Sequence, residues 1–204
     1  MQKRKSLFTH LIPILMLSGT VGAGANEDLP IYDGIGGDFS ASSTLGRDIS
    51  LSDYRDKIVL IFFGYTSCQD ICPAALGHLQ SLMLRLESDS EKVQVLFVTV
   101  DPENDTVEHL KQYLSRFDSR FVGLTGSSHQ IAEIAEQFMV KHDNGNGIKV
   151  TTAHHKSKTF TDRSFLYAHS QQIYLIDGLG RTRALFFIGS PLAEMETAIR
   201  SLLN

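Results

Sequence analysis

The chain has two cysteines among its 204 residues, Cys68 and Cys72, with three residues between them. Two thiols at this spacing can close a disulfide, exchange it with a partner, or hold a soft metal ion between their sulfur atoms. Pro73 has no N–H group to donate, so a regular helix is expected to begin near Cys72 with Pro73 in its first turn. Both sulfurs would then lie near the positive end of the helix dipole, which favours the thiolate form that either chemistry needs.

A structural disulfide is the alternative to a functional pair. Such a bond stabilises a protein by restricting the unfolded chain, and in that account the effect grows with the length of the loop that is closed. The segment from Cys68 to Cys72 has only five residues, so a disulfide there would add little stability. We therefore interpret the pair as a redox or metal-binding site.

The segments around the cysteines predict an α/β fold. Residues 58–63 (IVLIFF) form an uninterrupted apolar run, typical of a strand buried on both faces of a sheet, and residues 93–100 form a second. An amphipathic helix between them completes a βαβ unit, whose two strands are parallel. Cys68 and Cys72 follow the first strand directly, at the sheet edge where ligands and chemistry gather in α/β proteins.

The other predicted elements follow the order of a thioredoxin-like fold. A helix begins at Asp105, with Glu108 at capping-box spacing. The last helix starts with Ser190 as N-cap and Pro191 in its first position. We predict a central mixed sheet flanked by helices, with an N-terminal hairpin extension. The remaining predicted elements are the hairpin at 39–52, a helix at 128–138 and strands at 171–176 and 183–188.

The first 25 residues are interpreted as a signal peptide. They combine a basic start, a short apolar stretch and the sequence Ala23-Gly24-Ala25, which is typical of a cleavage site. The apolar stretch is shorter than the ~20 residues that cross a bilayer, so an uncleaved membrane anchor is the alternative reading. The mature chain is expected to be one domain, residues 26–204, in the periplasm, without stable membrane insertion.

Charge excludes one class of function. The chain carries 19 basic and 23 acidic residues, and its leader contains three basic and no acidic residues. The mature chain therefore has a net charge of −7, and it has no basic run. Proteins that bind nucleic acid use basic patches to neutralise phosphates, so no nucleic-acid partner is expected.

Three blocks of the sequence resemble the Sco/SenC family, copper chaperones that act in cytochrome c oxidase assembly. They are LSDYRDKIVLIFFGYTSCQDICP (51–73), VTVDPENDT (98–106) and AHSQQIYLIDGLGR (168–181). The resemblance implies that one copper ion is held by Cys68, Cys72 and His169, and that the partner is a client copper protein, a cytochrome c oxidase subunit. Two thiolates and an imidazole suit Cu(I), and with an added oxygen ligand also Cu(II).

Copper binding by two thiolates makes the Cys68–Cys72 disulfide an inactive state. A thiol–disulfide oxidoreductase that reduces cysteines of a client copper site is the rival function, so enzymatic activity stays open. Oxidoreductases of this fold carry a cis-proline before the strand that starts near residue 171, and here His169 stands at that place. A redox or copper sensor is a third possibility.

Two aspartates and the remaining histidines are secondary candidates. Asp101 ends a predicted strand and either orients a ligand or forms a turn. Asp70 is interpreted as a partner of the helix dipole more than as a ligand. His78, His109 and His129 are expected on solvated faces of helices. Three further histidines are interpreted as solvated loop side chains, with an accessory metal site as the alternative: His142, His154 and His155.

Overall fold

The computed structural model describes residues 29–140 and 171–203. Within these ranges seven strands form one mixed sheet in the order β2-β1-β5-β4-β3-β6-β7. The strands are β1 (Ser40–Ser43), β2 (Asp48–Ser50), β3 (Ile58–Gly64), β4 (Val93–Thr99), β5 (Val122–Thr125), β6 (Gln172–Ile176) and β7 (Thr182–Phe187). The helices are α1 (Ile71–Arg85), α2 (Val107–Leu114), α3 (Ser128–Gln137) and α5 (Leu192–Leu203), with the short 3-10 helices η1 (Leu51–Tyr54) and η2 (Glu87–Lys92).

The predicted βαβ unit is the centre of the sheet. β3 and β4 are parallel over their whole length, from the Ile58–Val93 pair to the Gly64–Thr99 pair. Every residue of β3 is buried, because helices cover one face of this strand and α3 with the N-terminal segment covers the other. A strand that is buried on both faces needs apolar side chains at successive positions, and this explains the uninterrupted apolar run. The sequence prediction for these strands and for α1 is confirmed.

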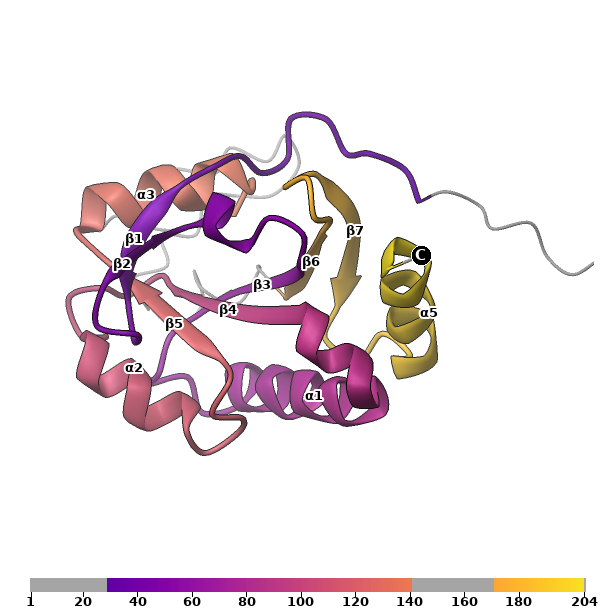
Figure 1. Ribbon diagram of the computed structural model, residues 1–204. Coiled ribbons are helices and arrows are strands. Elements are labelled where there is room, and N and C mark those ends of the chain that lie inside the picture. Colours follow the sequence, from indigo (N-terminus) through magenta and orange to yellow (C-terminus); the bar gives the residue numbers. More distant parts are fainter. Residues whose placement is uncertain (1–28, 141–170, 204) are drawn as a thin grey trace, which may run out of the picture.

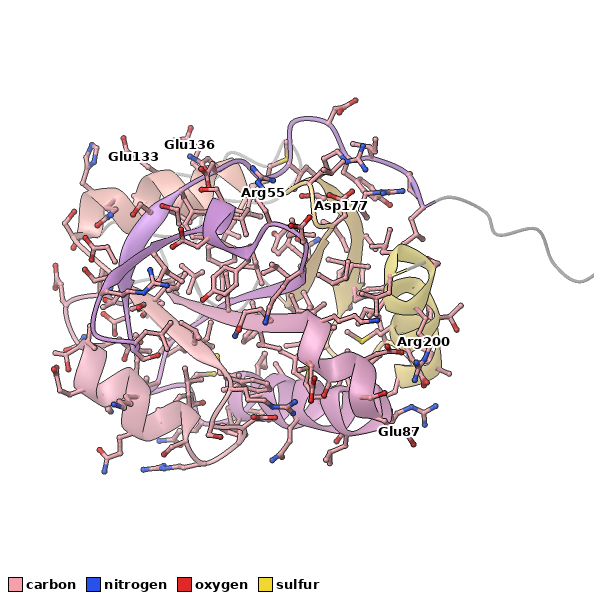
Figure 2. All side chains as sticks on the ribbon, viewed as in Figure 1. Arg55, Glu87, Glu133, Glu136, Asp177 and Arg200 are labelled. Atoms are coloured by element: carbon pink, nitrogen blue, oxygen red, sulfur yellow. The ribbon has the colours of Figure 1, made fainter. Side chains whose placement is uncertain are left out.

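Two hydrophobic clusters lie on opposite faces of the sheet. One packs α1, α2 and α5 against alternate residues of β3 and β4, and the other packs α3 against the intervening residues. Figure 1 shows α1 and α5 on one side of the strands and α3 on the other. Glu133 and Glu136 project from the outer side of α3 (Figure 2), as expected of an amphipathic helix with one buried face.

Strand β5 was missed by the sequence prediction. It has four residues, one of them Gly123, and so lacks a long β-branched or aromatic run. It joins the parallel strands to the N-terminal hairpin, since it pairs with β4 on one side and with β1 on the other. A Cβ at Gly123 would lie 2.9 Å from a side-chain atom of Leu114, so the glycine lets α2 pack closely on this strand.

Two helix starts differ from the prediction. Thr106, and not Asp105, is the N-cap of α2, and its side chain accepts the His109 N–H. α5 begins at Leu192, while the Ser190 hydroxyl accepts the Phe187 N–H. The Asp105 side chain is instead buried, and it accepts hydrogen bonds from residues of other elements.

The edge of the sheet that carries the cysteines is formed by the carboxyl ends of β3, β4 and β5, which are parallel. β6 runs antiparallel to β3 and pairs Ile173 with Phe62. The start of β6 therefore lies beside the end of β3. These strands, their helices and the N-terminal hairpin confirm the predicted thioredoxin-like architecture. In the two described ranges no helix is long and apolar enough to cross a membrane.

Candidate metal centre

The two cysteines lie at different depths. Cys68 is in the connection between β3 and α1 and is half-buried, whereas Cys72 is in the first turn of α1 and is only 4% exposed. The Cys68 N–H donates to the Tyr65 carbonyl (3.3 Å), which makes a turn. The Cys72 N–H donates to the Cys68 sulfur (3.4 Å). The structure has both residues as free thiols, and a metal can bind through both sulfurs only in this reduced form.

The protein environment separates the two thiols electrostatically. Burial alone would raise the pKa of Cys68, but the N–H groups of Cys72, Asp70 and Ile71 outweigh it and lower this pKa below its usual value. For Cys72, burial dominates and the charges of Cys68 and Asp105 add to it, so the pKa of Cys72 lies far above its usual value. The prediction that both sulfurs favour the thiolate is wrong for Cys72, because desolvation exceeds the effect of the helix N-terminus.

Gly64 makes room for the buried sulfur. A Cβ on this last residue of β3 would lie 2.9 Å from Cys72 Sγ and 2.9 Å from the Phe97 ring. Real Cβ atoms do not approach this closely, so any side chain here would displace the thiol or the ring. Sequence reasoning missed this residue. The available signal was a glycine that ends a buried strand directly before the cysteine loop.

Asp105 holds the cysteine loop to the neighbouring strand. Its carboxylate is 1% exposed and accepts the Thr66 N–H (3.1 Å), the Thr66 hydroxyl and the Thr99 hydroxyl (2.6 Å). Thr66 is two residues before Cys68, and Thr99 ends β4. The loop that carries Cys68 is thus tied to the carboxyl end of β4 by a buried acceptor with three donors.

The two aspartates predicted beside the site form local contacts. The Asp101 carboxylate accepts the Asn104 amide (2.9 Å to each oxygen), and the Asp101 carbonyl accepts the Asp105 N–H (2.9 Å). These contacts are those of a turn after β4. Asp70 is the exposed N-cap of α1, and its carbonyl accepts the Ala74 N–H (3.2 Å). It acts on Cys68 through its own N–H, which helps to lower the pKa of that thiol.

Tyr113 on α2 is a further neighbour that sequence reasoning missed. It is 8% exposed and belongs to the hydrophobic cluster that contains Cys72. Among the described residues, its hydroxyl is the buried side-chain polar atom that has no hydrogen-bond partner. Leaving such a group unpaired costs about 1–3 kcal/mol. The helical spacing from Leu110 could have placed the ring in the core, but nothing local signals the unpaired hydroxyl.

His169, the predicted third ligand, lies outside the described residues, as do His142, His154 and His155. Within residues 29–140 and 171–203, no three histidine, cysteine or acidic side chains gather as a metal-binding group. His109 and His129 are exposed, as predicted. The prediction for His78 is wrong, because it is half-buried and its Nε2 lies 2.9 Å from the Ser190 carbonyl, which joins α1 to the turn before α5.

Comparison with known proteins relates the chain to one family. A sequence model of SCO1/SenC matches residues 30–204. The chain belongs to the SCO1/SenC family. The mitochondrial SCO2 homolog of Bos taurus is 36% identical over 177 residues, which cover 82% of this chain and 62% of that protein. The resemblance found in the three sequence blocks is therefore confirmed.

Solved structures of the family share the fold. ScoI of Bradyrhizobium japonicum, solved with copper bound, is 32% identical, with a TM-score of 0.66 and coverage of 83% of this chain and 99% of that one. BsSco, a member of the Sco family of cytochrome c oxidase assembly proteins in which a disulfide switch was identified, is 21% identical, with a TM-score of 0.65. BsSco is covered over 96% of its chain and 86% of this one. Copper, the metal that the sequence predicts, is the metal bound in the first of these relatives.

Proposed function

We propose that this protein is a metallochaperone that binds one copper ion through Cys68, Cys72 and His169 and delivers it during cytochrome c oxidase assembly. The observation that carries the proposal is the pair of free thiols, one turn apart, at an edge of the sheet. Thiolates are the ligands that soft Cu(I) prefers. The copper-bound relative of the same fold supports the choice of metal.

The two cysteine ligands fit a protein that passes copper to a partner better than one that stores it. Cys68 is half-buried with a lowered pKa, so its sulfur is available to capture a metal and to pass it on. Cys72 is enclosed by Gly64 and Phe97 and would hold the metal from the interior side. Both thiols must lose their protons when the metal binds. Capture would therefore start at Cys68 and be completed at Cys72.

His169 is proposed as the third ligand on the strength of the family resemblance and of its place in the sequence. It precedes Gln172, the first residue of β6, by three residues, and three residues of chain span at most about 10 Å. β6 enters the sheet beside the end of β3, where the cysteine loop begins.

Thiol–disulfide exchange is the second candidate, and the unequal thiols favour it. In such a reaction the Cys68 thiolate would attack a client disulfide and release one client thiolate. Cys72 would then displace the second client sulfur and close the Cys68–Cys72 disulfide. A partly exposed cysteine of low pKa followed by a buried one suits these two steps. The peptide bonds of the described residues are all trans, so those residues lack the cis-proline of oxidoreductases.

Metal analysis and a reductase assay on the same reduced protein separate the two functions. The proposal expects one Cu(I) per chain in a competition titration, and strongly reduced uptake after oxidation to the disulfide. His169→Ala should weaken Cu(I) binding by more than the ~10–100-fold typical of residues that only orient a ligand. Reduction of a client disulfide without stoichiometric copper uptake would support the oxidoreductase. Copper affinity unchanged within about threefold in folded His169→Ala would remove His169 from the ligand set.

Export to the periplasm, after cleavage of residues 1–25, is part of the proposal. N-terminal sequencing of the exported protein should start at Asn26 or within a few residues of it. Intact Met1 in a membrane fraction would instead establish the uncleaved leader as an anchor.

A further inference from the structure

The hydroxyl of Tyr113 has no evident purpose in the copper-free protein. The ring packs against Phe97 (6.1 Å between centroids) and Phe117 (5.6 Å), and phenylalanine would make the same contacts. The hydroxyl adds a buried donor that finds no acceptor among the described residues. Buried polar groups are nearly always paired. An unpaired one beside a proposed ligand site therefore points to an acceptor that forms in another state of the protein.

Packing places Tyr113 and the two cysteines on the same face of the sheet. Tyr113 and Cys72 belong to one buried cluster, and Cys68 packs against it. Phe97 is their common neighbour, because a Cβ at Gly64 would touch both the Phe97 ring and Cys72 Sγ. The charged groups that act on the phenol are the two sulfurs and the buried carboxylate after β4, and that carboxylate already has three donors, so the sulfurs are the acceptors left for the phenol.

The charges around the phenol point to the same partner. Burial raises the pKa of Tyr113, and the sulfurs of Cys72 and Cys68, followed by the Asp105 carboxylate, raise it further. Cys72 is thus the neighbour whose ionisation would act most strongly on the hydroxyl. Tyrosine already keeps its proton at neutral pH, since its usual pKa is about 10. The phenol therefore stays a hydrogen-bond donor whether the neighbouring thiol is protonated or ionised.

We propose that Tyr113 is a positioning residue of the copper site, whose hydroxyl donates a hydrogen bond to the Cys72 sulfur when that sulfur becomes a copper-bound thiolate. The inference rests on the proposed function. A buried thiolate lacks the water that would normally stabilise its charge, and the phenol is a buried donor with no acceptor in the part of the chain that the structure describes. Copper loading brings the two together.

The hydrogen bond would also change the reduction potential of the bound copper. A donor to a coordinating sulfur withdraws electron density from it, and hydrogen bonding around a cysteine ligand is one of the factors that set the reduction potential of copper sites. Withdrawal of negative charge favours Cu(I) over Cu(II). Tyr113 would then bias the site toward Cu(I).

Tyr113→Phe tests the inference by removing one oxygen atom. We expect copper-free Tyr113→Phe to unfold at a urea concentration equal to or above that of the wild type, because an unpaired hydroxyl is lost. Its Cu(I) affinity should fall about tenfold, at the lower end of the range for residues that orient ligands. Its Cu(II)/Cu(I) potential should shift downward, and the sulfur-to-copper charge-transfer band of its Cu(II) form should move.

Tyr174→Phe is the matched control. Tyr174 is 1% exposed, on the opposite face of the sheet, and its hydroxyl lies within donating distance of two acceptors, the Phe138 carbonyl (2.8 Å) and Gln172 Oε1 (3.0 Å). This variant should lower the urea midpoint and leave the potential and the absorption band unchanged.

Three results bear on the inference in different ways. Cu(I) affinity within about threefold of wild type and an unmoved band in Tyr113→Phe would overturn the role of Tyr113, while wild-type copper binding left the proposed function intact. A lowered urea midpoint in copper-free Tyr113→Phe would also overturn it, because it would mean that the hydroxyl is already paired. Failure of the wild type to bind copper, or binding that survives Cys72→Ser, would overturn the proposed function itself.

Discussion

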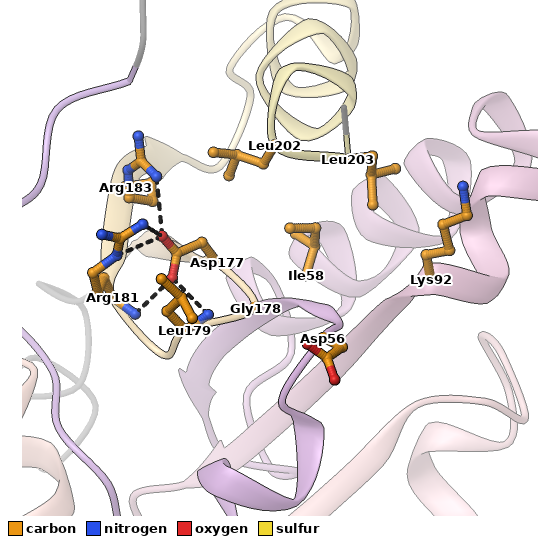
Figure 3. Close-up of a pocket in the computed structure, with 10 residues that line it drawn as sticks. All are labelled: Asp56, Ile58, Lys92, Asp177, Gly178, Leu179, Arg181, Arg183, Leu202 and Leu203. Carbon is orange, nitrogen blue, oxygen red and sulfur yellow. Dashed lines mark hydrogen bonds and ion pairs between the residues drawn. The ribbon is translucent and has the colours of Figure 1, made fainter.

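At the carboxyl ends of β3 and β4, the buried Cys72 thiol lies near Cys68 and the Phe97 ring, and the Tyr113 hydroxyl has no hydrogen-bond partner within the described ranges. At the opposite end of the sheet, the Asp177 carboxylate follows β6 and accepts four hydrogen bonds. The donors are the N–H groups of Leu179 and Arg181 (3.0 Å each) and the guanidinium groups of Arg181 (2.8 Å) and Arg183 (3.0 Å). Figure 3 shows both arginines converging on this carboxylate.

One end of the sheet carries the proposed copper ligands, and the other end is a structural support. Arg183 also donates to the carbonyls of Leu29 and Pro30, so the Asp177 cluster fastens the N-terminal segment to the β6–β7 turn and leaves no evident need for a ligand. The cysteine end has one thiol of lowered pKa, one buried thiol of raised pKa, and a buried hydroxyl without a hydrogen-bond partner among the described residues. A metal would complete it. The effect of a substitution at one end on copper affinity or on stability can therefore be compared with the effect of a substitution at the other end.

The largest effect is expected for Cys72→Ser. A hydroxyl is a poor ligand for Cu(I), so we expect copper affinity to fall by more than the ~10–100-fold typical of orienting residues. Competition titration with a Cu(I) chelator measures the change. Asp177→Asn serves as the reference and should bind copper like the wild type. Equal affinity in wild type and folded Cys72→Ser would show that the metal, if bound, lies elsewhere.

Asp177→Ala should cause the largest loss of stability. Arg183, whose side chain is 9% exposed, would lose its carboxylate partner, and breaking a buried pair from one side costs about 3–5 kcal/mol. Urea unfolding of the reduced, copper-free protein measures it. Asp53→Ala removes the exposed partner of Arg47 and should change the midpoint far less. Equal losses in the two variants would contradict the comparison between the two ends.

Gly64→Ala should damage the cysteine end by steric means. Its new methyl group would meet Cys72 Sγ and Phe97 at 2.9 Å, and overpacking of this kind costs about 1–3 kcal/mol. We also expect weaker copper binding, because the thiol is displaced. Gly77→Ala in α1 is the control, since its Cβ would meet nothing within 4 Å and should stabilise the helix by about 0.5–1 kcal/mol. A stable Gly64→Ala protein with wild-type copper affinity would refute the close contact.

The smallest effect is a dependence of stability on pH at the Asp177 end. Burial opposes ionisation of Asp177, but hydrogen bonds from Arg181, Arg183 and Leu179 outweigh it and hold its pKa below the usual 3.8. A lowered pKa gives stability that is present above the unfolded-state value and is lost as the pH falls through the folded-state value. The difference in unfolding free energy between wild type and Asp177→Asn should therefore be constant from pH 7 to 5 and shrink below about pH 4. A difference that stays constant into this acidic range would assign the stability to another group.

The local pattern of the chain is enough to predict much of the architecture and the position of the reactive pair. Apolar runs and helical periodicity predict strand β3, helix α1 and strand β4, because burial on both faces requires an unbroken run. Pro73 locates the start of α1 within two residues, since a proline without an N–H group fits only the first turn. The family follows from motifs that surround the cysteines.

Other features come only from the tertiary structure, because their causes lie far apart in the sequence. The local pattern at Asp105 predicts a helix start. Its side chain is instead buried and accepts a hydrogen bond from Thr66, which is 39 residues away in the sequence. The short strand β5 exists because β1 and β4 flank it. The raised pKa of Cys72 could not be predicted from the helix N-terminus, because it is set by the packing of α1 onto β3 and β4. Sequence determined where the thiols stand along the chain, and only packing decided how differently the two behave.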